Sequence, residues 1–185
     1  KINPNKLKDD LEQMIWQLDE PLADPAALNV LYISRKAKEM GIKVLLSGLG
    51  GDDILTGYRR HLALKYNSLF TWMPIYLRNQ LENITDKFDK RNASGRRFSK
   101  LFENASLDGN ERLISYFKWI KFNNLKNIYT GELKKSSDNT NIDKPFIEFL
   151  SQIDNSISPL NKMLLLEQRF FLGDHNLTYT DKMSM

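Results

Sequence analysis

The sequence predicts a chain that is predominantly α-helical and contains one or two short strands. Apolar residues recur at helical spacing over most of its length, whereas residues 42–46 form a short apolar run that is partly β-branched. A run of this kind is typical of a strand buried on both faces, as in a parallel sheet. We therefore expect a strand over residues 42–47 and helices elsewhere.

A glycine-rich turn, SGLGGDD at residues 47–53, follows the expected strand directly, and a helix is predicted from about Asp52 to Tyr66. A strand, a glycine turn and a helix start together build a phosphate site. Glycines let the backbone approach an anion closely, and free N–H groups at the helix start point toward it. The pattern is neither the dinucleotide fingerprint nor a P-loop, because the Gly-Lys-Ser/Thr sequence is missing.

Two neighbouring carboxylates, Asp52 and Asp53, lie at the end of this turn. Either of them could cap the helix, since acidic residues are common and favourable near a helix N-terminus. Alternatively, they could hold a Mg²⁺ ion, which binds carboxylate and phosphate oxygens together. The spacing by itself leaves both interpretations open.

The segment before the turn predicts two helices. Residues 6–18 carry apolar side chains on one face, and the helix should end before Pro21, because proline disfavours helical geometry in the residue that precedes it. Asp24 and Pro25 predict an N-cap followed by proline at the first helical position. This second helix should run to about Met40, with Gly41 in the left-handed position past its end.

The middle of the chain, from about residue 67 to 159, gives helix signals only. We predict a helix over residues 74–89, a capping box from Asp108 to Glu111, and a polar loop over residues 136–141. A final long helix should start at Pro159. The basic stretch over residues 90–100 could bind nucleic acid, but its apolar spacing favours a helix with a solvated basic face. On the helix after the glycine turn, Leu55, Tyr58, Leu62, Tyr66 and Leu69 should share the buried face.

The composition fits an ordinary globular protein. Of its 185 residues, 41% are hydrophobic and 27% are charged, and the net charge of +4 does not call for nucleic acid or a membrane as partner. No apolar run approaches the roughly 18 residues of a membrane-spanning helix. The absence of cysteine excludes disulfides and thiolate metal sites and fits a cytoplasmic protein. Two histidines, His61 and His175, are too few to suggest a zinc site.

Three segments resemble one enzyme family. SGLGGDDILTGY at residues 47–58 is similar to the SG(D/E)G(G/A/S)DE-x-x-x-GY signature in the synthetase domain of glutamine-hydrolysing asparagine synthetases. DEPLAD at residues 19–24 resembles that family's DEP-x-AD segment, and DKMSM at residues 181–185 resembles the start of its D-(R/K)-x-SM stretch. The order of the three motifs makes the resemblance specific.

The resemblance implies a fold for the parent protein, namely an α/β fold of the adenine-nucleotide α-hydrolase-like (ATP pyrophosphatase) type. Residues 1–66 would then belong to its nucleotide-binding core, residues 67–160 to a helical region, and residues 161–185 to a helix and site segment. The chain begins without methionine and stops inside a site motif of the family. We therefore expect it to be an excised piece of a longer protein. The parent protein could form a homodimer.

The resemblance also implies the chemistry. The family uses ATP and Mg²⁺ to place AMP on the aspartate carboxylate, releasing pyrophosphate, and ammonia from a glutaminase domain then displaces AMP to give asparagine. Ser47 and Gly48 would contact the adenylate, while Gly50 and Gly51 shape the loop. Asp52 would bind the metal and Lys182 would act as the catalytic cation on the reacting phosphates. Without the resemblance, Lys182 would be interpreted as a surface lysine.

Two departures from the family pattern limit these expectations. The SGGxDS pyrophosphate loop and the glutaminase domain are missing from this sequence, so we expect the chain alone to be inactive. Leu49 stands where the family has Asp or Glu, and leucine cannot pair with the ammonium group of an amino-acid acceptor. The alternatives are therefore a related enzyme that acts on another acid, such as a sugar carboxylate, or a non-catalytic helical binding module.

Overall fold

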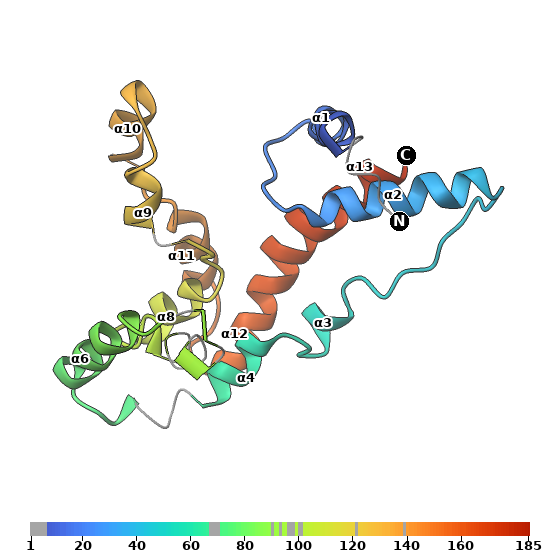
Figure 1. Ribbon diagram of the computed structural model, residues 1–185. Coiled ribbons are helices and arrows are strands. Elements are labelled where there is room, and N and C mark those ends of the chain that lie inside the picture. The colour runs from blue at the N-terminus through green and yellow to red at the C-terminus, as the bar shows by residue number, and fades with distance from the viewer. Residues whose placement is uncertain are drawn as a thin grey trace. The chain divides into compact units, whose positions relative to one another are not determined.

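A computed structural model describes residues 7–66, 71–89, 91–92, 94–95, 99, 102–120, 122–138 and 140–185. All regular structure in these ranges is helical, as Figure 1 shows, and they contain no strand. The chain divides into two compact units. We call Lys1–Gly57 together with Leu164–Met185 the motif unit, and Tyr58–Met163 the middle unit.

The motif unit is built around the packing of its first two helices against the last one. Its helices are α1 (Leu7–Leu18), α2 (Ala26–Glu39), α3 (Gly51–Ile54), the π-helix η2 (Glu167–Leu177) and α13 (Thr178–Ser184), with α12 (Pro159–Leu166) at the boundary between the units. Helical spacing brings the apolar residues of three helices together in one core, which consists of Met14, Leu18, Ala27, Leu31, Tyr179 and Met183. Each larger side chain contributes about 1.5–3 kcal/mol by leaving water.

Both ends of α2 follow the chemistry expected from the sequence. Asp24 Oδ1 accepts a hydrogen bond from the Ala26 N–H at 2.8 Å, although the helix begins one residue later than predicted. At the other end Gly41 has a φ of 74°, and the Ile42 N–H donates to the Ala37 carbonyl at 2.9 Å. This pair of features is a Schellman motif, so the prediction for Gly41 is confirmed.

The strand predicted over residues 42–47 is wrong for this structure. The segment is irregular, and its apolar side chains face solvent, with Leu46 98% exposed. A strand requires a hydrogen-bonding partner, and the described part of the chain offers none. The apolar side chains of this run are therefore not buried in the structure.

The long helix predicted from Asp52 to Tyr66 is also wrong. The helix α3 ends at Ile54, Thr56 adopts a φ of 62°, and α4 (Arg59–Lys65) begins only after this break. The interruption changes the buried face of α4, which carries His61 and Leu64. Of the side chains predicted to share that face, Tyr58 is half-buried, whereas Leu55, Leu62 and Tyr66 are exposed and Leu69 lies outside the described residues.

The middle unit confirms the helical character predicted for this part of the chain. Besides α4, it contains α6 (Ile75–Asp86), α8 (Gly109–Ser115), α9 (Phe122–Lys126), α10 (Gly131–Asp138) and α11 (Lys144–Ser151). The helix α10 extends through Ser136 and Ser137, so the polar loop predicted to start at residue 136 begins later. The basic helix predicted over residues 90–100 lies mostly outside the described residues.

A buried arginine replaces the capping box predicted at Asp108. The guanidinium of Arg78 donates to both carboxylate oxygens of Asp108 at 2.7 Å and to the Ala105 carbonyl at 3.1 Å. Asp108 therefore occupies the N-cap position of α8 without a side-chain cap. The hydrogen bonds from Arg78 hold the pKa of Asp108 below its usual value.

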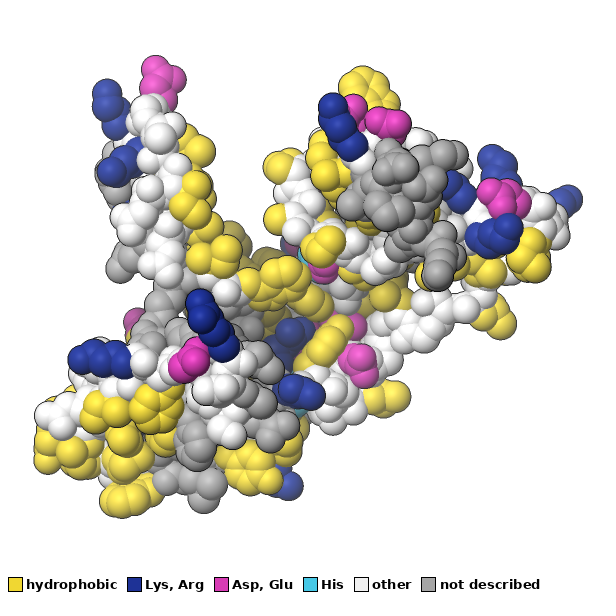
Figure 2. All heavy atoms as spheres, in the orientation of Figure 1, with side chains coloured by type: hydrophobic (Ala, Val, Ile, Leu, Met, Phe, Trp, Pro, Cys, Tyr) yellow, Lys and Arg dark blue, Asp and Glu magenta, His cyan; other side chains and the backbone are white. Residues whose placement is uncertain are grey.

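The final helix predicted from Pro159 is present, but its central part is not an α-helix. The segment η2 has the i→i+5 hydrogen bonding of a π-helix and is flanked by α12 and α13. Exposed apolar side chains, yellow in Figure 2, occur on both units. In the described part of the chain, no helix is both long enough and apolar enough to cross a bilayer.

Candidate functional site

All three sequence motifs lie in the motif unit. The DEPLAD segment follows α1, the glycine turn precedes and enters α3, and the DKMSM segment lies in α13 and at its end. Side-chain contacts from η2 and α13 reach both of the other segments. These contacts link segments that are far apart in the sequence.

Lys182, the predicted catalytic cation, forms an ion pair with Asp19 of the DEPLAD segment. Its ammonium group donates a hydrogen bond to Asp19 Oδ2, and this bond, together with the negative charge, raises the pKa of Lys182. About a third of the Lys182 side chain remains exposed. The lysine is thus charged, accessible and attached to a second motif.

Asp24, at the other end of the DEPLAD segment, contacts His175 of η2. Its Oδ2 atom lies 3.2 Å from His175 Nε2, while its Oδ1 atom receives the N–H of Ala26. The imidazole also stacks on Phe171, with 4.7 Å between ring centroids, and meets Tyr179 edge-on at 5.4 Å. Aromatic rings therefore fix the plane in which the imidazole can form hydrogen bonds.

The next residue, Asn176, continues this contact to the glycine turn. Its Oδ1 atom lies 2.9 Å from His175 Nδ1, and its Nδ2 group donates to Asp53 Oδ2 at 3.5 Å. Asn176 is 5% exposed and Asp53 only 1%. A π-helix has more residues per turn than an α-helix, so adjacent side chains diverge by a smaller angle. This geometry helps neighbouring residues of η2 to contact each other. We call the four residues Asp24, His175, Asn176 and Asp53 the polar network.

Tyr179 lies beside the polar network and contacts the ring of His175. Burial raises the pKa of the phenol, and the carboxylates of Asp24 and Asp53 raise it further. The Tyr179 ring also belongs to the core between α1, α2 and α13. One residue therefore connects the polar contacts to the apolar packing that supports them.

The glycine turn is held by its own hydrogen bonds. The Leu49 N–H donates to Ser47 Oγ at 3.1 Å, and the Gly51 N–H donates to the Gly48 carbonyl at 3.1 Å. Gly50 has a φ of 88°, and a Cβ atom there would lie 3.3 Å from Leu172 of η2. The left-handed backbone thus favours glycine at position 50, and a Cβ atom there would also require the Leu172 side chain to shift slightly.

Gly48 and Gly51 have no such explanation within the described part of the chain. A Cβ atom at either position would meet nothing within 4 Å, and neither residue has the left-handed φ that favours glycine. Ser47 and Gly48 are exposed. The turn therefore presents a backbone edge without side chains, to which a ligand could approach closely.

The two aspartates of the turn have different environments. Gly50 occupies the N-cap position of α3, so the interpretation of either aspartate as the N-cap does not hold. Asp52 is exposed, whereas Asp53 is buried and receives a hydrogen bond from Asn176. Mg²⁺ commonly takes one or two carboxylates and completes its shell with water and substrate phosphates. Asp52 fits that role, while no group of three or more His, Asp or Glu residues in the described ranges could hold a metal alone.

Comparison with known proteins assigns the family. The sequence matches the asparagine synthase family over residues 1–185. The chain belongs to the asparagine synthase family.

Among the relatives, asparagine synthetase [glutamine-hydrolyzing] 1 of Bacillus subtilis is 27% identical over 187 residues, which cover 100% of this chain and 28% of that protein. Proteins of Mycobacterium bovis and Mycobacterium tuberculosis, also named as asparagine synthetases, are 35% identical over 105 residues, covering 55% of this chain and 15% of theirs. The chain thus spans under a third of the length of these relatives. No solved structure matches it significantly.

The structure adds residues that the sequence motifs did not single out. His175 and Asn176 precede the DKMSM segment of this asparagine synthase family member, and neither of them belongs to one of the three motifs. His175 and Tyr179 are four residues apart, a spacing that places both on one helix face and could have indicated their contact. The partner of His175, Asp24, could not be found in this way because it comes from a distant segment.

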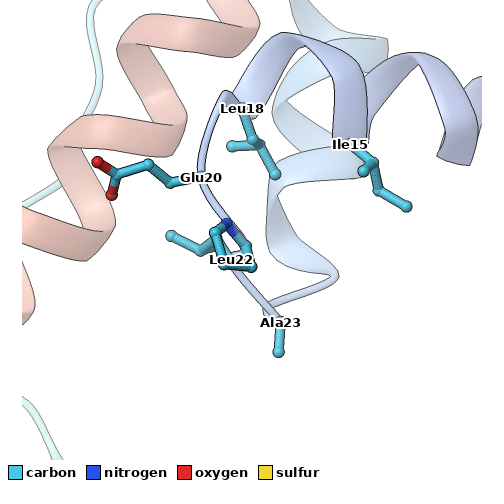
Figure 3. A pocket seen from close by; sticks show the side chains of 6 residues that line it. Ile15, Leu18, Glu20, Leu22 and Ala23 are labelled. Atoms are coloured by element: carbon cyan, nitrogen blue, oxygen red, sulfur yellow. The ribbon is translucent and has the colours of Figure 1, made fainter. Parts of the chain in front are cut away.

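A cavity of about 260 Å³ lies beside the DEPLAD segment. As Figure 3 shows, its walls come from the end of α1 and the following turn, and they consist of Ile15, Leu18, Glu20, Pro21, Leu22 and Ala23. Glu20 is the one charged residue among these and its carboxylate points away from Ile15. The cavity wall is therefore largely apolar and does not by itself define a site.

Proposed function

We propose that the chain is part of the synthetase portion of an ATP-dependent amidotransferase. The enzyme transfers AMP from ATP to the side-chain carboxylate of aspartate and then lets glutamine-derived ammonia replace AMP, which gives asparagine. Pyrophosphate and AMP are the other products. The observation that carries the proposal is that, within one unit of an asparagine synthase family member, Lys182 of DKMSM pairs with DEPLAD, while the preceding helix η2 contacts both DEPLAD and the glycine turn.

The residues of the motif unit have distinct roles in this proposal. Ser47 and Gly48 bind the adenylate, and the open space at Gly48 and Gly51 supports such a close approach. Gly50 sets the shape of the loop through its left-handed backbone. Asp52 holds Mg²⁺, which would offset the negative charge of the phosphates and the acceptor carboxylate.

Lys182 is the proposed catalytic cation on the reacting phosphates. In the structure Asp19 balances its charge, so binding of a triphosphate would exchange one anionic partner of Lys182 for another. The pairing keeps the ammonium group protonated and fixes its position before substrate arrives. Ammonia is supplied by a glutaminase domain, and the reaction takes place in the cytoplasm.

A second candidate function differs only in the acceptor. Leu49 is half-buried in the glycine turn, and its apolar side chain offers no partner to the ammonium group of aspartate. Leaving such a charge desolvated and unpaired is costly. An acid without an amino group, such as a sugar carboxylate, would avoid that cost.

The test of the reaction class is ATP–pyrophosphate exchange by the full-length protein. Aspartate is compared with glucuronate and galacturonate, each with Mg²⁺ present. Carboxylate-dependent exchange is expected, and the preferred acid decides between the two acceptors. A protein that shows no exchange with any carboxylic acid would overturn the proposal in favour of a non-catalytic binding module.

The proposed metal ligand is tested by Asp52→Asn. The amide keeps the size of the side chain but loses the charge that attracts the cation, so half-maximal pyrophosphate release should require about tenfold more Mg²⁺. Asp9→Asn, an exposed position on α1, is the matched control and should leave the Mg²⁺ dependence unchanged. An unchanged curve for Asp52→Asn would remove Asp52 from the metal site.

A further inference from the structure

Asp19 contacts Lys182 through a bond that a dissolved anion could replace. Its Oδ2 atom accepts a hydrogen bond from the Lys182 ammonium group, and within the described part of the chain this is the one side-chain hydrogen bond of either residue. The Asp19 side chain is 66% exposed and the Lys182 side chain 34%. Both partners of the pair are therefore accessible from solution.

A second ion pair of the motif unit, between Arg35 and Asp10, is built differently. The Arg35 guanidinium donates to Asp10 and also to Gln13, and Asp10 accepts a further hydrogen bond from the Tyr32 hydroxyl at 2.8 Å. Only 13% of the Asp10 side chain is exposed. Several side chains thus hold that pair together between α1 and α2, whereas the pair at the end of α1 depends on a single bond.

The position of α13 does not depend on Asp19. Tyr179 and Met183, which lie on either side of Lys182 in the sequence of this helix, are buried and belong to the core shared with α1 and α2. An exposed ion pair adds little to such packing, because water and salt screen its charges. The fold therefore gains little from the carboxylate of Asp19.

The backbone at position 19 favours a different residue. Asp19 follows the last residue of α1 and has a φ of 61°, the left-handed conformation that glycine adopts most readily after a helix end. A side chain at this position costs stability that glycine would not cost. Neither the backbone nor the core therefore accounts for an aspartate here, whereas the contact with Lys182 does.

We infer that Asp19 is an internal competitor for the nucleotide at Lys182. The inference rests on the proposed function, in which Lys182 acts on the phosphates of ATP. While Lys182 is paired, the carboxylate offsets its charge, so the phosphates gain its full attraction only after Asp19 has been displaced. The apparent dissociation constant is then the intrinsic constant divided by the fraction of molecules in which Lys182 is released. Because exposed ion pairs are weak, Asp19 should weaken nucleotide binding by only about threefold.

The competition is tested by Asp19→Asn in the full-length protein. Asparagine keeps the size of the side chain and tolerates a left-handed backbone, but it carries no charge to offset the ammonium group. Binding of Mg·ATP, measured by titration calorimetry, should tighten about threefold. In ATP–pyrophosphate exchange the KM for ATP should fall by the same factor, while the maximal rate changes by less than about twofold. A residue that merely supported the fold would weaken binding or lower the maximal rate when it is altered.

Glu20→Gln is the matched control, because it removes one negative charge from the next residue. The charge of Glu20 also acts on Lys182, but in the described part of the chain the ammonium group donates to Asp19 and not to Glu20. This variant should therefore change the affinity for Mg·ATP by less than about twofold. If it tightens binding as much as Asp19→Asn does, the effect belongs to negative charge in general and the inference fails.

Asp19→Gly separates the competition from any support of the fold. Glycine relieves the left-handed backbone, so amide exchange at the end of α1 should be unchanged or slower, while Mg·ATP binding tightens as in Asp19→Asn. Faster exchange would show that Asp19 supports the fold and would overturn the inference. If the unaltered protein and all variants fail to bind Mg·ATP, the proposed function fails and the competition with it. If the protein binds, and Asp19→Asn binds equally or more weakly, the competition fails alone.

Discussion

The motif unit and the middle unit use charged side chains in different ways. In the middle unit, Arg78 pairs with Asp108 and Lys118 with Asp143, and the partners are 30 and 25 residues apart in the sequence. In the motif unit, Asn176 donates a hydrogen bond to Asp53, which is 123 residues away, and Lys182 pairs with Asp19, which is 163 residues away. Contacts of the first kind join nearby helices and also occur in the motif unit, where Arg35 pairs with Asp10, 25 residues away, whereas contacts of the second kind join distant segments.

The exposure of the cations separates Arg78 from Lys182, although Lys118 of the middle unit is about as exposed as Lys182. The Arg78 side chain is 6% exposed, and its guanidinium donates to the Met73 and Ala105 carbonyls and pairs with Asp108. Lys182 keeps a third of its side chain accessible, and Ser47, Gly48 and Asp52 are exposed. A group that acts on a ligand has to remain reachable, whereas a group that supports the fold does not.

The largest expected effect comes from the core of the motif unit. Leu31→Ala removes a side chain that is 3% exposed and should lower the free energy of unfolding of this unit by about 3 kcal/mol. Ile33→Ala, on the same helix but 59% exposed, should cost less than about 1 kcal/mol. Amide hydrogen exchange reports each unit separately. An equal loss of protection in the middle unit would show that the two units do not unfold independently.

The converse experiment removes the ion pair of the middle unit. Asp108→Ala leaves the buried guanidinium of Arg78 without its carboxylate, although the Ala105 and Met73 carbonyls still accept from it. The cost should be about 2 kcal/mol. Glu148→Ala, which loses only an exposed pair with Lys144, should change stability by less than about 1 kcal/mol. The comparison fails if hydrogen exchange shows the larger loss in the motif unit.

A smaller effect is expected at the glycine turn, where two glycines should behave differently. Gly50→Ala forces a left-handed backbone on a residue with a Cβ atom and should cost about 1–2 kcal/mol, seen as faster amide exchange in α3. Gly48→Ala should leave this exchange nearly unchanged, because a Cβ atom there meets nothing. The same Gly48 variant should weaken nucleotide binding in the full-length protein. Equal stability losses would mean that both glycines serve the fold.

The smallest expected effect is the pH dependence of the Arg78–Asp108 pair. The pKa of Asp108 is lowered in the folded protein, so its contribution is complete above the unfolded value near 4 and is lost as the pH falls through the folded value. The stability difference between the unaltered protein and Asp108→Asn should therefore shrink between pH 5 and pH 2. Because Asp108 is half exposed, we expect a change of less than about 1 kcal/mol. A difference that grows on acidification would contradict the assignment.

Much of the local structure was predictable because it depends on neighbouring residues. The end of α1 before Pro21, the hydrogen bond from the Ala26 N–H to Asp24 and the left-handed Gly41 each follow from side chains within a few residues. Burial in α1 follows the apolar spacing only in part, because Met14 and Leu18 are buried whereas Leu11 and Ile15 are exposed. The family and its three motifs were likewise visible in the sequence alone.

The remaining features were decided by tertiary structure. Residues 42–47 have the composition of a strand, but a strand forms only beside another strand. Asp108 has the sequence context of a cap, but Arg78, 30 residues away, offers it a charged partner. The sequence gives no partner for His175, whereas the fold places Asp24 and Asn176 against its two ring nitrogens. The sequence by itself determined what bonds within a turn of helix or a loop, whereas contacts between distant segments depend on which side chains the packed core brings within hydrogen-bonding distance.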